Sequence, residues 1–269
     1  MVTRRKTRHG AALVTGAARR IGRAIALALA GDGWDVAVHY ATSRDDALRT
    51  VAEIEELGRR AVAVNRDLAV EAGVRSLLAE CAHELGPVTC LVNNASLFER
   101  DDATTFSGER FLSAMRTNVA APVLLAQALR DQLPPEARGV VINLLDQKLA
   151  NPNPDFLSYT LSKAALQEAT TLLAMALAPS VRVVGVAPGL TLVSGEQSEE
   201  GFERAHTRTP LGCSSTPADI AQAIVYLARA QAVTGTTLLV DGGQHLVPSE
   251  RDVMFLTDPP RPRNGGSRP

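Results

Sequence analysis

Short apolar runs alternate along the chain with longer segments in which apolar residues recur every three or four positions. Runs such as AALV (11–14), AVAVN (61–65) and VVINLLD (140–146) are apolar almost throughout, which is typical of parallel strands covered on both faces. The segments between them have helical periodicity, as in the face formed by Ile21, Ile25 and Leu29. Seven such runs interleaved with helices predict an α/β fold built on one doubly wound, seven-stranded parallel sheet.

Nothing divides this alternation into two domains, and 269 residues are enough to bury one full core. We therefore predict a single domain over residues 11–248. Residues 1–10 carry a cluster of basic side chains ahead of any periodic pattern and predict a flexible arm, whereas residues 249–269 contain PPRPRNGGSRP and predict a disordered tail. The apolar stretch VMFL (253–256) within that tail has no evident purpose in a disordered segment. We hypothesise that it reaches the site of a neighbouring subunit.

A glycine-rich turn follows the first apolar run and leads into the first helix, in the sequence TGAARRIG. Strand, glycine turn and helix is the order of a Rossmann-type dinucleotide site. Gly16 allows the backbone to turn tightly, Gly22 allows close packing of the helix, and the first amides of the helix can bind a pyrophosphate. The spacing is not the strict GxGxxG, so the motif depends on this context.

The second apolar run, DVAVHY, ends at His39-Tyr40 with no acidic residue where an NAD site would place one for the ribose 2′-hydroxyl. Arg19 and Arg20 lie in the glycine turn, and Ser43-Arg44 follow the strand. These side chains can together hold a 2′-phosphate, so the sequence favours NADPH over NADH. The alternative is that the arginines are ordinary surface charges.

A tyrosine and a lysine stand four residues apart, Tyr159 and Lys163, in a segment with helical character. Both side chains should therefore point from one helix face. An ammonium group beside a phenol favours the phenolate, and at roughly 4 Å in an effective dielectric of about 20 the attraction is about 4 kcal/mol. We expect Lys163 to lower the pKa of Tyr159 and make it a proton donor. Such a pair is also found on solvated helix faces.

Composition narrows the function classes. A net charge of −1 and an isoelectric point near 6.5 disfavour a nucleic-acid surface and favour small-molecule chemistry. Cys81, Cys90 and Cys213 lack CxxC spacing and the histidines lack HxxxH spacing, so no metal is predicted. No run reaches the roughly 18 apolar residues of a membrane span, and the basic start lacks an apolar signal core. We expect a cytoplasmic protein without a membrane or nucleic-acid partner.

From about residue 10 to 247 the chain resembles the short-chain dehydrogenase/reductase family. The resemblance rests on TGAARRIG, Asp67, NNAS (93–96), Asn118, Tyr159 with Lys163, Pro188-Gly189 and the final VDGG, in that order. It implies that Asp67 and Leu68 lie at the adenine, Asn94 and Ala95 along the adenosine ribose, Lys163 on the nicotinamide ribose and Thr191 near the nicotinamide amide. The expected cofactor-binding residues are Gly16, Arg19, Arg20, Ile21, Gly22, His39, Tyr40, Ser43, Asp67, Leu68, Asn94, Ala95, Tyr159, Lys163, Pro188, Gly189 and Thr191.

One departure from the family pattern concerns the residue 13 positions before Tyr159, which is Asp146 where the family usually has serine. A serine hydroxyl donates to a carbonyl oxygen as charge develops on it. A carboxylate donates only when protonated, and its charge would repel a growing alkoxide. Reduction of a ring C=N bond needs a proton on nitrogen instead, and a carboxylate beside Tyr159 can help to deliver it and can accept a bond from a substrate amino group.

The departure is itself a resemblance, to pteridine reductases and dihydromonapterin or dihydrofolate reductases, together with the two arginines, the HY strand end, NNASLF and PGLT. It implies that Phe98 stacks a pterin against the nicotinamide and that Arg20 reaches both cofactor phosphate and substrate. We expect catalysis by Asp146, Tyr159, Lys163 and Asn118, the last holding a relay water, and substrate binding by Arg20, Phe98, Asp146 and Tyr159. Phe98 as core filler, and Asp146 as a tolerated replacement, are the alternatives.

The expected activity is NADPH-dependent reduction of a pterin or dihydrofolate-like ring. One alternative is a carbonyl reductase of a 3-oxoacyl thioester, sugar or steroid, and another is an inactive NADPH-binding sensor or scaffold, which the retained Tyr159, Lys163 and Asn118 disfavour. The family resemblance also implies a homotetramer that packs through the helices at about 108–133 and 157–178.

Overall fold

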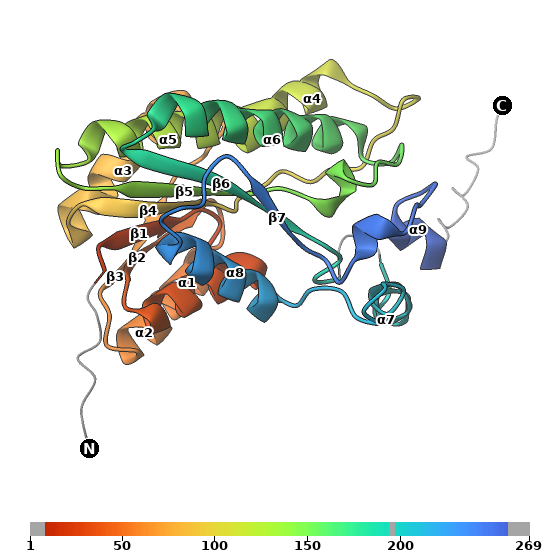
Figure 1. The fold of residues 1–269 in the computed structure, drawn as a ribbon, viewed down its shortest axis with the longest axis horizontal. Coiled ribbons are helices and arrows are strands. Elements are labelled where there is room, and N and C mark those ends of the chain that lie inside the picture. The colour runs from red at the N-terminus through yellow and green to blue at the C-terminus, as the bar shows by residue number, and fades with distance from the viewer. Residues whose placement is uncertain (1–8, 194–196, 258–269) are drawn as a thin grey trace.

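The computed structural model describes residues 9–193 and 197–257 of the chain. The predicted arm up to residue 8 and the tail after residue 257 therefore lie outside the described residues. The described chain forms one seven-stranded, all-parallel sheet between two helical layers (Figure 1). The predicted α/β fold class with a single doubly wound sheet is confirmed.

The strands follow the apolar runs closely. They are β1 (Ala11–Val14), β2 (Asp35–Tyr40), β3 (Ala61–Asn65), β4 (Val88–Asn93), β5 (Gly139–Leu144), β6 (Val181–Pro188) and β7 (Thr237–Val240). The helices are α1 (Arg20–Asp32), α2 (Arg44–Glu56), α3 (Glu71–Leu85), α4 (Gly108–Met115), α5 (Ala121–Gln132), α6 (Leu157–Leu177), α7 (Glu199–His206), α8 (Pro217–Arg229) and α9 (Val253–Thr257). A π-turn, η1 (Arg116–Ala120), joins α4 to α5, and short 3₁₀ turns stand at η2 (Gln147–Leu149) and η3 (Gln244–Leu246).

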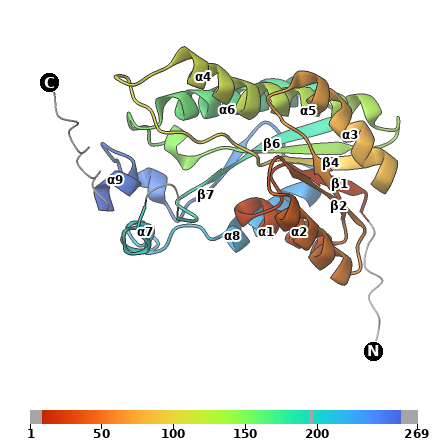
Figure 2. The same ribbon diagram turned by 180° about the vertical axis from the view of Figure 1, so that it is seen from behind.

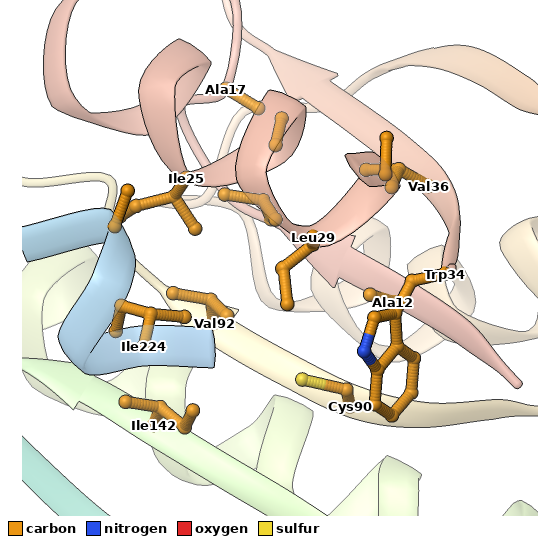
Figure 3. Packing of buried hydrophobic residues seen from close by; sticks show 14 of the residues in the cluster. Ala12, Ala17, Ile25, Leu29, Trp34, Val36, Cys90, Val92, Ile142 and Ile224 are labelled. Carbon is orange, nitrogen blue, oxygen red and sulfur yellow. The ribbon is translucent and has the colours of Figure 1, made fainter. Parts of the chain in front are cut away.

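Each face of the sheet is covered by its own layer of helices, with α1, α2 and α8 on one side and α3 to α6 on the other (Figures 1 and 2). Alternate residues of a strand enter opposite cores, so Ala12 and Val14 of β1 pack under α1 while Ala11 and Leu13 pack under α3 and α5. Figure 3 shows the first core, where helix side chains such as Leu29 and Ile224 meet strand residues. Burial on both faces is the reason these strands read as continuous apolar runs.

The strand order β3-β2-β1-β4-β5-β6-β7 reverses its direction between β1 and β4. In open parallel sheets a crevice forms at this switch point, outside the carboxyl ends of the strands, and ligands bind there. The turn after β1, the segment after β4 and the segment after β5 all meet at this edge. The topology thus brings together stretches that are far apart in the sequence.

Buried polar contacts fix the middle strands relative to α6. The Asn93 side-chain amide donates to Asn143 Oδ1 at 2.8 Å, and Asn143 Nδ2 donates to Thr170 Oγ1 at 2.9 Å. Buried amide and hydroxyl groups are costly unless paired, so this chain of bonds constrains the register of β4, β5 and α6. It lies directly below the crevice.

Among residues 9–193 and 197–257, none of the helices combines the length and apolar character needed to span a bilayer. In the same part of the chain, no three His, Cys, Asp or Glu side chains gather as a metal ion would require.

The glycine turn between β1 and α1 is built on very close backbone approach. Gly16 has a positive φ of 64°, which glycine adopts at no steric cost. A Cβ on Gly22 would lie 2.1 Å from the Gly16 carbonyl oxygen and 2.6 Å from the Asn94 amide nitrogen. Gly31, in the last turn of the same helix, has no atom within 4 Å of an added Cβ. Of these two glycines of α1, Gly22 is therefore the one that close packing requires.

These two glycines of α1 make a matched test. Gly22→Ala should destabilise the protein by about 2 kcal/mol or more, since the methyl group must displace the Gly16 backbone. Gly31→Ala should stabilise it by roughly 1 kcal/mol, because alanine is the better helix former. Urea unfolding of both variants measures the difference. Equal effects of the two substitutions would contradict the close-packing role of Gly22.

Candidate active site

The loop after β4 is fastened to the glycine turn. Thr15 Oγ1 accepts hydrogen bonds from the backbone amides of Asn94 and Ala95, at 2.9 and 3.0 Å. The Asn94 side-chain amide donates to the carbonyl of Thr15 at 2.8 Å and to that of Gly16 at 3.2 Å. Asn94 and Ala95 thus lie beside the glycine turn, where the cofactor is predicted to bind. The side-chain amide of Asn94, however, is already hydrogen-bonded to the backbone of that turn. Thr15, which the sequence analysis did not single out, is the centre of this arrangement.

His39 is a structural residue whose ring is closed to a ligand. It is buried, and its Nδ1 accepts from the Gly16 amide while Nε2 contacts the Arg66 carbonyl, both at 3.0 Å. The ring must be neutral with its proton on Nε2 to make both bonds, and burial lowers its pKa to about 4. The two ring nitrogens thus serve to hold the glycine turn, and cofactor binding by the residue His39 stays a prediction.

The two arginines of the turn point to different places. Arg20 has a positive φ of 55° at the start of α1. Its Nη2 donates to the Val193 carbonyl at 2.8 Å, and its side chain lines a cavity at the carboxyl ends of the strands. Arg19 is largely exposed, with its Nε 3.7 Å from Asp46 of α2. Ser43 occupies the N-cap position of α2 but makes no capping bond with its side chain. Arg19 and Ser43 thus lie at the start of α2, whereas Arg20 lines the cavity.

Tyr159 and Asp146 form the centre of the cavity. Asp146 follows β5 and Tyr159 is in the first turn of α6, and the phenol donates to Asp146 Oδ2 at 2.8 Å. Asp146 Oδ1 accepts from the Lys148 amide at 2.9 Å. Lys163, one turn after Tyr159, donates to the Leu144 carbonyl at 2.6 Å and has its Nζ 5.6 Å from the centre of the Tyr159 ring. Three of the four predicted catalytic side chains, those of Asp146, Tyr159 and Lys163, line one cavity of about 450 Å³.

The protonation of this group differs from the expectation that Lys163 lowers the pKa of Tyr159. Burial, then the charge and hydrogen bond of Asp146, raise the pKa of Tyr159 well above its usual value. Burial also raises the pKa of Asp146 and lowers the pKa of Lys163 to about 8. After burial, the carboxylate that accepts the phenol's hydrogen bond is the largest cause of this shift. Tyr159 is held as the protonated phenol.

The start of α6 is fixed by Asp101, which lies in the segment after β4. Its Oδ1 accepts from the Ser158 amide at 3.0 Å, its Oδ2 accepts from the Ser158 hydroxyl, and its carbonyl accepts from the Leu157 amide. The preceding Phe156 has a positive φ of 55°, a conformation that costs free energy in a bulky residue. Asp101 thus offsets local strain and sets the position of Tyr159.

Asn118 lies in the π-turn between α4 and α5. Its Oδ1 accepts from the Leu97 amide at 2.8 Å, and its Nδ2 donates to the Leu97 carbonyl at 3.0 Å and to Ser162 Oγ at 2.9 Å. Both amide hydrogens are therefore engaged, and the side chain fixes the loop before Phe98. The side chain of Asn118 therefore has a positioning role, and the expectation that Asn118 holds a relay water stays a prediction.

Phe98 stands beside Tyr159 at the mouth of the cavity and is 41% exposed. One face stacks on Phe156 with ring centres 4.3 Å apart, and Tyr159 meets it edge-on at 4.7 Å. Its remaining exposure makes it unlike a core residue. A planar ring can stack there.

The C-terminal segment departs from the sequence analysis in two respects. Residues 249–257 are not disordered, since they include the helix α9 and Met254 is buried against Phe156 and Tyr159. The hypothesis that VMFL reaches a neighbouring subunit's site is also corrected, because Val253 and Met254 line the cavity of their own chain.

The cavity collects predicted and unpredicted residues. Of the predicted ones it contains Arg20, Ile21, Asn94, Phe98, Asp146, Tyr159, Lys163, Pro188, Gly189 and Thr191. Gly16, Arg19, Gly22, His39, Tyr40, Ser43, Asp67, Leu68, Ala95 and Asn118 do not line it, and most of these lie around the glycine turn and the ends of β2, β3 and β4. The sequence analysis missed Ser96, Gln147, Lys148, Gln244 and Asp252. Adjacency to Asp146 was a signal for Gln147 and Lys148, whereas nothing in the sequence pattern marked Gln244 or Asp252.

The residues present fit a dinucleotide. The cradle between Gly16 and Gly22 leaves no room for a Cβ, the first amides of α1 stand at its edge, and it opens into the cavity that holds Lys163 and Thr191. The Thr191 hydroxyl is 2.8 Å from both the Gly189 carbonyl and Ser215 Oγ. These two contacts fix the position of Thr191 at the cavity.

Comparison with known proteins gives consistent similarities. Residues 16–245 match the family described as Enoyl-(Acyl carrier protein) reductase. The chain is 32% identical over 240 residues to the 3-oxoacyl-[acyl-carrier-protein] reductase FabG of Staphylococcus epidermidis, covering 87% of this chain and 98% of the relative. Among solved structures it is similar to FolM alternative dihydrofolate reductase 1 from Brucella canis complexed with NADP, at 38% identity and a TM-score of 0.84, covering 90% and 97% of the two chains. It is also similar to the angucycline C-6 ketoreductase LanV with bound NADP, at 32% identity and a TM-score of 0.83, covering 90% and 98%.

Acidification should weaken the fold through His39. Its pKa is about 4 in the folded chain and near 6.5 unfolded, so the unfolded state takes up the proton first and stability falls as the pH drops from 6.5 towards 4. Between pH 7 and 5 the loss should be roughly 2 kcal/mol. Urea unfolding at the two pH values measures it. The variant His39→Gln should show a smaller difference, and an unchanged difference would contradict the assignment.

The Asp146 carboxylate should be what keeps the Tyr159 phenol from ionising. In Asp146→Asn the negative charge is gone, so the pKa of Tyr159 should fall. The chain has three tyrosines, and subtracting the phenolate absorbance of Tyr159→Phe from that of each protein isolates the one of interest. A Tyr159 titration that is the same in the wild type and Asp146→Asn would show that burial alone sets it.

Proposed function

This chain belongs to the short-chain dehydrogenase/reductase family, and within that family we propose that it is an NADPH-dependent reductase of a pterin or dihydrofolate-like ring. The observation that carries the proposal is the 2.8 Å bond from the Tyr159 hydroxyl to Asp146 Oδ2. Similarity to a dihydrofolate reductase solved with NADP supports it. The exposed position of Phe98 next to the same phenol is a second support.

The Asp146 carboxylate suits a ring C=N bond better than a ketone. During ketone reduction negative charge grows on oxygen, and a neighbouring carboxylate repels it in a site shielded from water. During C=N reduction the nitrogen takes a proton and no alkoxide forms. Asp146 is partly buried and accepts bonds from Tyr159 and from the Lys148 amide. Asp146 is therefore in place to accept a hydrogen bond from an amino group of the substrate.

Proton delivery then uses the phenol and carboxyl in sequence. Tyr159 gives its hydroxyl proton to the ring nitrogen, and the phenolate left behind faces Asp146 across the existing hydrogen bond. Since burial raises the pKa of Asp146, its carboxylate can then take up a proton from water that enters the cavity and pass that proton to the phenolate. Lys163, buried one turn away, compensates the negative charge of the pair.

The bound cofactor supplies the hydride for the ring carbon. Gly16, Gly22 and the start of α1 would hold its pyrophosphate, Arg19 and Ser43 would hold its 2′-phosphate, and Lys163 would hold its nicotinamide ribose. Phe98 stacks on the substrate ring and Arg20 approaches its edge, since both line the cavity beside Tyr159.

A carbonyl reductase is the second candidate. The chain is 32% identical to FabG of Staphylococcus epidermidis and also 32% identical to the ketoreductase LanV. The raised pKa of Asp146 gives this reading a physical basis, because a protonated carboxyl group can donate to a carbonyl oxygen.

The assembly of the protein is also a proposal. A homotetramer through α4, α5 and α6 is supported by large apolar side chains exposed on two of these helices, namely Leu112 of α4 and Leu161, Leu172 and Met175 of α6.

A substrate panel followed by NADPH absorbance decides between the two activities. With 7,8-dihydropterins, dihydrofolate and a set of ketones, we expect turnover of the pteridines, much faster with NADPH than with NADH. Tyr159→Phe should lose at least about a hundredfold in kcat with NADPH binding intact, because the proton donor is gone.

Asp146→Ser is the sharper variant. It should lose pteridine turnover and gain ketone reduction, since a hydroxyl replaces the carboxylate. Asp131→Ser, which removes an exposed carboxylate of α5, is the matched control and should behave as the wild type. Faster pteridine turnover in Asp146→Ser would refute the role given to the carboxylate.

A further inference from the structure

The stretch from Arg251 to Phe255, called here the C-terminal wall, closes one side of the catalytic cavity in its own chain. Asp252, Val253 and Met254 line that cavity together with Asp146 and Tyr159. We propose that the C-terminal wall contacts the bound substrate and that Met254 limits the size of the substituent which the substrate ring can carry. The inference concerns the same site as the proposed function and rests on it only for the identity of the substrate.

The wall is held by a buried carboxylate in the segment before α6. Asp155 is buried, and its two oxygens accept from Arg251 Nη2 at 2.7 Å and Nε at 2.9 Å. Its Oδ2 also accepts from the Asp252 amide at 2.7 Å. A paired guanidinium group and a backbone amide on one carboxylate make a directional attachment. The wall is thus fixed to the segment that leads into Tyr159.

A second ionic contact lies inside the cavity. Lys148 is buried, donates to the Asp155 carbonyl, and has its Nζ 3.5 Å from Asp252 Oδ2. Lys148 comes from η2, directly after Asp146, so this pair joins the wall to the strand end that carries the catalytic carboxyl group. Asp252 also contributes to the raised pKa of both Asp146 and Tyr159. The wall therefore lies within electrostatic reach of the proton donor.

Apolar contacts place the wall against the residues that would meet the substrate. Met254 is buried in a cluster with Phe156 and Tyr159. Phe255 stacks on Phe156 with centres 5.9 Å apart, and Phe156 in turn stacks on Phe98. The guanidinium groups of Arg100 and Arg251 lie 4.5 and 5.2 Å from the centre of the Phe255 ring. The ring of Phe98 is thus supported from behind by the wall.

These contacts constrain where the substrate can lie. The atom that receives the proton must be within hydrogen-bond reach of the Tyr159 hydroxyl, and Met254 packs against that residue. A ring held there lies next to Met254, which lines the same cavity. Methionine is flexible enough to adapt to a ligand and long enough to exclude a bulky one. The side chain at position 254 is therefore placed to select by size.

The first experiment compares Met254→Ala with Leu256→Ala, a residue of the same helix that is 47% exposed and does not line the catalytic cavity. Each variant is assayed with a small and a bulky dihydropteridine, such as dihydrobiopterin and dihydrofolate. Met254→Ala should change the ratio of their kcat/KM values by at least about tenfold in favour of the bulky substrate, whereas Leu256→Ala should leave it unchanged. An unchanged ratio in Met254→Ala overturns the proposal.

The second experiment tests the attachment of the wall. Arg251→Ala removes the pair with Asp155, so substrate KM should rise about tenfold or more, kcat should change less, and NADPH affinity should stay the same. Arg130→Ala, which breaks the exposed pair with Asp131, is the matched control. A wild-type KM in Arg251→Ala, or a loss of NADPH affinity in parallel with KM, overturns the proposed role of the wall.

The two proposals fail separately. If the wild type reduces ketones and no pteridine, the proposed function is wrong, and the same variants are then assayed with a small and a bulky ketone. A size effect of Met254→Ala on those substrates would still support the wall.

Discussion

The hydrogen bond between the Tyr159 phenol and the Asp146 carboxyl group is the contact on which the rest of the site depends. Two acidic groups 2.8 Å apart in a buried place cannot both be charged without a large penalty. Their pKa values are raised, so the pair retains protons at neutral pH more strongly than either group would in water. Lys163 and Lys148, both buried nearby, bear the compensating positive charge. A site of this kind is suited to giving a proton to a weakly basic nitrogen.

The fold secures this contact from both sides. Asp146 comes directly after β5, whose register is fixed by the bonds from Asn143 to β4 and α6. Tyr159 is set by the start of α6, where Asp101 receives the Ser158 amide and hydroxyl. Because these supports come from the segments after β4 and within α6, a small shift of either element would separate phenol and carboxyl. This explains why polar residues occur inside an otherwise apolar core.

The same segment that carries the phenol also carries the attachment of the C-terminal wall. Asp155 binds Arg251 and the Asp252 amide, and four residues later in the chain Tyr159 faces the cavity that the wall closes. Proton donor, stacking ring and wall therefore form one connected unit around Phe156. If the two proposals hold, substrate selection and proton delivery would both depend on that unit, because Phe156 packs against the phenol, the stacking ring and the wall.

The sequence by itself determined the fold class, the order of strands and helices, the glycine turn and the pairing of Tyr159 with Lys163 on one helix face, because these follow from local periodicity and short spacing. It also identified Asp146 as the unusual residue. The tertiary structure decided which groups face each other. Burial and then Asp146, and not Lys163, set the direction in which the pKa of Tyr159 is shifted, and His39 and Asn118 use their side chains to hold backbone segments. Residues 252–254 line the cavity of their own chain. Such contacts join residues up to 97 positions apart, as between Asp155 and Asp252. Distances of that kind depend on the packing of the whole sheet, which no local pattern encodes.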